Sequence, residues 1–115
     1  MAKITMAITS IADRAVAVAG TRVQLSLTPL LVTNITIQWA PTNAGNVYIG
    51  DSLVTATRGL ILNAANPVAN ISVDDTEADE DKIYINLMDI WIDAANAGDK
   101  VKLSYLVVSG KDYNA

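Results

Sequence analysis

The side chains that could do chemistry in this 115-residue sequence are carboxylates, hydroxyls and a few aromatic rings, because the chain contains no histidine and no cysteine. These absences remove the commonest general base, the commonest metal ligand and the cysteine nucleophile. Asp51, Asp89 and Asp93 remain as candidates for a paired site, since two carboxyl groups about 5–10 Å apart can hydrolyse a glycosidic bond. Their spacing selects no pair, and no histidine can activate the serines at Ser10, Ser26, Ser52 and Ser104. We therefore predict that the protein is not an enzyme.

An acidic run, "DDTEADEDK" at positions 74–82, holds half of the twelve Asp and Glu residues of the chain. Its oxygens could bind calcium, but the run lacks the central Gly and the distal Glu of a helix-loop-helix calcium loop. Blocks of like charge usually repel each other and stay solvated. We favour an exposed connection between strands at 74–81 over a calcium site, and we expect no cofactor.

The aromatic rings are the third set of candidates. Exposed Trp and Tyr rings stack on sugars in carbohydrate-binding sandwiches, whereas rings within alternating apolar segments pack in a core or anchor an interface. Trp39 and Tyr48 lie in such segments, so we favour packing and take Trp39, Tyr48 and Trp91 as interface candidates. Glycan binding stays open as the alternative. The complete set of rings is Trp39, Trp91, Tyr48, Tyr84, Tyr105 and Tyr113.

The composition of the chain argues against two classes of partner. The net charge is −4 and the eight Lys and Arg residues are scattered, so the basic stripe that a nucleic acid backbone requires is missing. The first 25 residues alternate apolar with polar side chains, unlike a signal peptide or a membrane helix of about 20 apolar residues. We expect neither nucleic acid nor a membrane as a partner. With 51% hydrophobic residues the chain can bury a core.

Period-two alternation predicts the elements that must position these residues. Short runs such as "AVAVAG", "TRVQLSL", "ITIQW", "NVYIG", "ANISV" and "VKLSYLVV" follow one another along the chain, and Gly, Pro, Asn and Asp separate them. Many short strands at this spacing indicate two packed antiparallel sheets. We predict an all-β fold, an antiparallel β-sandwich with jelly-roll topology, in a single domain over residues 1–115.

Two turns are nearly identical in sequence, Asn43-Ala44-Gly45 and Asn96-Ala97-Gly98. Gly adopts positive φ at little cost, and Asn tolerates the left-handed region while bonding to its own backbone. We predict that each turn closes a hairpin.

The N-terminal segment "AKITMAITSIA" (2–12) carries Ile4, Met6 and Ile8 on one parity. These three residues are interface candidates as well. The segment 1–12 could lie across a neighbouring subunit as an arm, or it could form an edge strand of its own sandwich.

Three long segments carry a resemblance to known proteins: "GTRVQLSLTP" (20–29), "ITIQWAPTNAGNVYIGDSLVTATRGLIL" (35–62) and "DKIYINLMDIWIDAANAGDKVKLSYLV" (81–107). In this order they resemble small β-rich virion structural proteins of tailed bacteriophages, of the capsid decoration (cement) or head-fibre type. The resemblance implies a homo-oligomer, with a trimer as first choice, that binds the major capsid protein or another virion protein. It places the protein in the virion after synthesis in the cytoplasm of a bacterial host, and it implies no catalytic residue. A glycan- or receptor-binding module of a phage fibre, tail or baseplate is the alternative.

Overall fold

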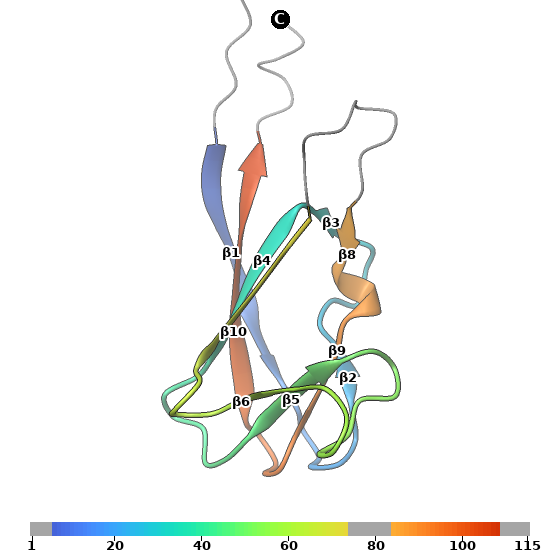
Figure 1. Ribbon diagram of the computed structural model, residues 1–115, viewed down its shortest axis with the longest axis vertical. Helices are drawn as coiled ribbons and strands as arrows, with labels where there is room; N and C mark the ends of the chain where they lie inside the picture. The colour runs from blue at the N-terminus through green and yellow to red at the C-terminus, as the bar shows by residue number, and fades with distance from the viewer. Residues whose placement is uncertain (1–5, 74–83, 109–115) are drawn as a thin grey trace, which may run out of the picture.

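The structure, a computed structural model, describes residues 6–73 and 84–108 of the chain (Figure 1). Within these residues the strands form two four-stranded antiparallel sheets, ordered β1-β10-β4-β7 and β2-β9-β5-β6, and a two-stranded sheet of β3 and β8. The prediction of an all-β antiparallel fold is confirmed, and the arrangement is compatible with a β-sandwich. The elements are β1 (Met6–Ala15), β2 (Val23–Gln24), β3 (Leu31–Val32), β4 (Asn34–Trp39), β5 (Val47–Gly50), β6 (Leu60–Leu62), β7 (Val68–Ser72), β8 (Ile85–Asn86), the 3-10 helix η2 (Leu87–Asp89), β9 (Trp91–Ala94) and β10 (Lys100–Val108).

The strands pair in a nested order. β1 pairs with β10, β2 with β9, β3 with β8, β4 with β7 and β5 with β6, so the chain forms one long antiparallel ribbon. Two further antiparallel pairings, β10 with β4 and β9 with β5, fold that ribbon over into the two larger sheets. Consequently the connections from β4 to β5, from β6 to β7 and from β9 to β10 each cross from one sheet to the other.

The core lies between the two larger sheets. Alternate residues of β4 and β10 face inward, among them Ile35, Ile37 and Leu103, and they meet Ile49 of β5 and Ile92 of β9. Each of these aliphatic side chains contributes about 1.5–3 kcal/mol when fully buried. The period-two pattern therefore describes the inward faces of the main strands correctly.

The two Asn-Ala-Gly turns do not close hairpins, so that prediction is wrong. Asn43–Gly45 joins β4 to β5 and Asn96–Gly98 joins β9 to β10, and the strands on either side of each turn belong to different sheets. Turn residues reverse the chain, but the burial of the apolar faces decides which strand becomes the partner. Of the two glycines only Gly98 has a positive φ, at 86°.

The alternating run "AVAVAG" is also not a strand beyond its first residue. β1 ends at Ala15, Val16 enters the core, and the chain then runs as a loop in which Val18 is exposed. The backbone N–H of Gly20 donates to the buried Asp93 carboxylate at 3.0 Å. This bond fixes the loop beside Asp93 of β9.

Candidate functional site

A row of polar side chains crosses the outer face of the β1-β10-β4-β7 sheet. In register, Ser10 of β1 lies opposite Ser104 of β10, Ser104 lies opposite Thr36 of β4, and Thr36 lies opposite Asn70 of β7. The neighbouring residues of β4 and β10 are buried in the core, so this row faces outward. The Thr36 hydroxyl donates to Asn70 Oδ1 at 2.8 Å. The row offers hydroxyl and amide groups to a polar partner.

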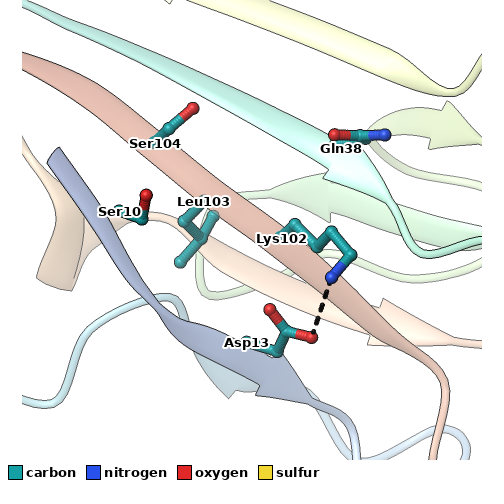
Figure 2. A pocket seen from close by; sticks show the side chains of 6 residues that line it. All are labelled: Ser10, Asp13, Gln38, Lys102, Leu103 and Ser104. Atoms are coloured by element: carbon teal, nitrogen blue, oxygen red, sulfur yellow. Dashed lines mark ion pairs between the residues drawn. The ribbon is translucent and has the colours of Figure 1, made fainter. Parts of the chain in front are cut away.

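An open depression of about 260 Å³ lies beside this row (Figure 2). Asp13 points toward Lys102, with 3.6 Å between Asp13 Oδ2 and Lys102 Nζ, and Lys100 Nζ lies 3.7 Å from the same oxygen. The register of β1 shifts between Ile11 and Arg14, which places Asp13 at an irregularity of the strand. The lining residues include no aromatic ring that could stack on a sugar; they are Ser10, Asp13, Gln38, Lys102, Leu103 and Ser104.

The other large sheet has an apolar flank, which we define as Val18, Leu53, Leu60 and Ile61. These side chains are between 46% and 59% exposed. Leu60 and Ile61 belong to the edge strand β6, Leu53 to the loop between β5 and β6, and Val18 to the loop between β1 and β2. Leu60 and Ile61 are consecutive in β6, so their side chains point to opposite faces of that strand, and what the four residues share is their exposure.

The three carboxylates that the sequence singled out lie in different elements. Asp51 accepts the backbone N–H of Leu53 at 2.9 Å and lies 3.8 Å from Arg58 Nη2. Asp93, in β9, is 5% exposed and accepts the N–H groups of Gly20 and Ala94 through Oδ1. Asp89 is exposed in η2. The contacts of Asp51 and Asp93 therefore serve local structure, since each carboxylate holds the backbone of a loop.

A fourth carboxylate, Asp99, was missed by sequence reasoning and joins the two Asn-Ala-Gly turns. It is 5% exposed, and its two oxygens accept the N–H groups of Ala44 and Gly45, each at 2.9 Å. From the opposite direction, the Asn43 amide pairs with the backbone of Lys100, donating to its carbonyl at 2.7 Å and accepting its N–H at 2.8 Å. We call residues 43–45 and 96–100 the turn clasp. Its only signal in the sequence is the Asp that directly follows the second turn.

The turn clasp also holds an aromatic ring. Trp39 Nε1 donates to the Gly45 carbonyl at 2.8 Å, and the ring is half-buried against the core. Tyr48 is buried, opposite Asp93 and Ile61 in the sheet. Trp91 and Tyr105 are half-buried, whereas Tyr84 is 49% exposed; Tyr113 lies outside the described residues. Among the described rings, Tyr84 alone is largely open to solvent, so they form no stacking platform.

The N-terminal interface candidates divide between two regions. Ile4 lies outside the described residues. Met6 and Ile8 lie in β1, opposite Val108 and Leu106 of β10, so that Met6–Ala15 forms an edge strand of its own sheet. This position corresponds to the edge-strand alternative for residues 6–12.

The acidic run 74–82 lies outside the described residues. Across residues 6–73 and 84–108, no group of three or more carboxylates is placed to hold a metal ion. The same part of the chain contains no helix that is long and apolar enough to cross a membrane.

No protein-family model, no curated protein and no solved structure matches this chain.

Proposed function

We propose that the protein is a structural component of a bacteriophage virion, namely a capsid decoration (cement) protein that binds the capsid surface as a homo-oligomer. The observation that carries this proposal is the nested pairing of the strands. A trimer is the expected oligomer, and the major capsid protein is the expected partner.

The nested pairing supports a jelly-roll topology. When the eight strands of the two larger sheets are counted in chain order, the sheets read 1-8-3-6 and 2-7-4-5. This order arises when a ribbon of four strand pairs is folded over on itself, which gives the two Greek keys of a jelly roll. Jelly rolls recur in viral capsid proteins and in lectins. The topology therefore agrees with the resemblance of residues 20–29, 35–62 and 81–107 to virion proteins.

The surfaces suit a protein that binds a shell and its own copies. The polar row and the depression at Asp13 lie on one sheet, and the apolar flank lies on the other. A decoration protein needs a surface that meets the shell and is separate from the contact between its own copies. The buried carboxylates Asp93 and Asp99 hold loops in place, which favours a rigid scaffold.

Quantitative mass spectrometry of purified virions tests the proposal. A decoration protein is expected at a copy number comparable with that of the major capsid protein. Capsids depleted of the protein should regain thermal stability when the purified chain is added, and bovine serum albumin serves as the control addition. Absence from virions, together with no binding to depleted capsids, would overturn the proposal. A copy number of only a few per virion would point to a tail or baseplate position instead.

One observation favours the alternative, a glycan- or receptor-binding module. The hydroxyl and amide row of Ser10, Ser104, Thr36 and Asn70 could bond to sugar hydroxyls. Isothermal titration with host-surface polysaccharide, using wild type and Thr36→Ala, separates the two functions. A decoration protein should release no heat with either, whereas saturable binding that Thr36→Ala weakens would favour the alternative.

A further inference from the structure

β1 and β10 continue together beyond the sheet to which they belong. β4 pairs with β10 from Val101 to Ser104, while β1 stays paired with β10 up to Val108. We call the segment formed by residues 6–9 and 105–108 the protruding ribbon. Figure 1 shows these two strands running past β4, which leans away toward β7. Among the described strands, the ribbon thus consists of β1 and β10 alone.

Among the described strands, none pairs with either outer edge of the protruding ribbon. β1 is the edge strand of its sheet, and the opposite edge of β10 loses β4 after Ser104. A two-stranded ribbon is at best marginally stable in water, and an open edge is a template for pairing with another chain. An unpaired strand edge is normally covered by another segment or another chain.

The residue types of the ribbon favour another copy of the same chain as that cover. Residues 6–9 are Met-Ala-Ile-Thr and residues 105–108 are Tyr-Leu-Val-Val, so the segment carries no charge. Copies of a chain with net charge −4 repel each other at long range. An uncharged contact brings no like charges face to face, and the residues of the segment are mostly of types favoured in strands or cores.

We propose that the protruding ribbon is the self-association element, in which β10 of one copy pairs with β1 of the next and three copies close into a six-stranded antiparallel barrel. The inference rests on the homo-oligomer part of the proposed function. The two open edges belong to different strands, so the contact is heterologous, and heterologous contacts either close into a ring or continue as a filament.

Strand direction is consistent with a closed ring. β1 and β10 run antiparallel within one ribbon. Rotation about an axis along the ribbon keeps these directions, so each new contact of β10 with a neighbouring β1 is antiparallel as well. The number of copies comes from the trimer expected under the proposed function, and three copies would supply six strands to the ring. Closure also removes every open edge from the ribbon.

Light scattering after size-exclusion chromatography tests the inference on the full chain. We expect three times the chain mass of 12.2 kDa. Leu106→Lys, and separately a chain lacking residues 1–9, should fall to the mass of one chain because they charge or remove the ribbon. The shortened chain keeps the bond of 2.6 Å from Arg14 Nε to the Gln24 carbonyl, which ties the rest of β1 to β2. Ile61→Lys, on the open edge strand β6, is the matched control and should stay trimeric.

Circular dichroism and thermal melting establish that each variant is folded. If both ribbon variants unfold, hydrogen exchange of the full chain tests the inference instead. Within residues 6–9 and 105–108, the amides that point away from the β1–β10 pairing should then be protected at concentrations that give the trimer and should exchange at concentrations that give the monomer.

A full chain that stays monomeric at micromolar concentration would overturn the inference, as would folded ribbon variants that remain trimeric or equal protection at both concentrations. If Ile61→Lys dissociated the trimer and the ribbon variants did not, the contact between copies would involve the apolar flank instead. Cosedimentation with depleted capsids tests the proposed function independently of this inference. A trimer that depends on the ribbon but does not bind depleted capsids would support this inference and overturn the capsid role. A monomer that binds depleted capsids would overturn this inference and support the capsid role.

Discussion

The carboxylate of Asp99 accepts the backbone N–H of Gly45 at 2.9 Å, so the residue that follows the second Asn-Ala-Gly turn holds the first. The second carboxylate oxygen accepts the N–H of Ala44. These bonds join the crossing from β4 to β5 with the crossing from β9 to β10. The two Asn-Ala-Gly turns are thus hydrogen-bonded to each other where the chain crosses between the two sheets. The backbone N–H groups of the first turn depend on the residue that follows the second turn.

Replacing Asp99 by Asn should destabilise the fold by about 2 kcal/mol. The amide keeps one acceptor but turns an NH₂ group toward a backbone N–H, and charge-assisted bonds of this kind contribute about 1.5–3 kcal/mol each. Urea unfolding followed by tryptophan fluorescence measures the change. Asp89→Asn, at an exposed position of η2, is the control and should stay within about 0.5 kcal/mol of wild type. Equal effects of the two substitutions would show that the clasp contributes little.

Gly45→Ala should destabilise the fold by about 1 kcal/mol or less, because the added Cβ would meet only the terminal side-chain nitrogen of Asn96, which is exposed and can move aside. Asn96→Ala removes that nitrogen, so the double variant should recover at least half of the loss. A double-mutant cycle measured by urea unfolding gives the coupling between the two positions. Strictly additive effects would mean that the cost of the Gly45→Ala substitution has another origin.

Asp13→Asn should change the free energy of unfolding by less than about 1 kcal/mol. Its ion pairs with Lys100 and Lys102 span 3.7 and 3.6 Å, and all three side chains are between 34% and 49% exposed. Exposed pairs of this kind contribute little and are screened by salt. Unfolding in low and high salt should show the small difference shrinking as salt rises. A loss of several kcal/mol would indicate that Asp13 has a structural role beyond these pairs.

Chelation with EDTA should leave the melting temperature unchanged. The acidic run 74–82 lacks the spacing of a calcium loop. Differential scanning fluorimetry with EDTA, with EDTA plus excess calcium, and with EDTA plus excess magnesium as the matched control measures this directly. A drop of several degrees that calcium alone restores would identify the run as a calcium site, since a ligand of the folded state stabilises it by mass action.

The main strands could be predicted from the sequence because burial follows alternation there. Ile35 and Ile37 face the core while Thr36 and Gln38 face outward, as a period of two requires. The run around Val18 alternates equally well and yet forms a loop. Its position depends on the bond between Gly20 and Asp93, which lie 73 residues apart and which no local pattern connects.

The turn clasp could be predicted only in part. Gly and Asn marked the two reversals correctly, but they were expected to act through their own backbones. Asn43 instead pairs with Lys100, and Gly45 lies against the side chain of Asn96. Such contacts exist only after the two sheets have been assembled, so the residue types alone could not reveal them.

The nested order of the strands also bears on how the chain is synthesised and folds. The partner of β1 is β10, so β1 leaves the ribosome before the other described strands and stays without its neighbour until nearly the whole described chain has followed. β5 and β6, which are close in sequence, can pair early, and the more distant pairs have to close larger loops. Pairing dominated by distant segments gives folding times of about milliseconds to seconds. During that interval, on a polysome where nascent chains lie side by side, a waiting β1 could meet the β10 of a neighbour as readily as its own.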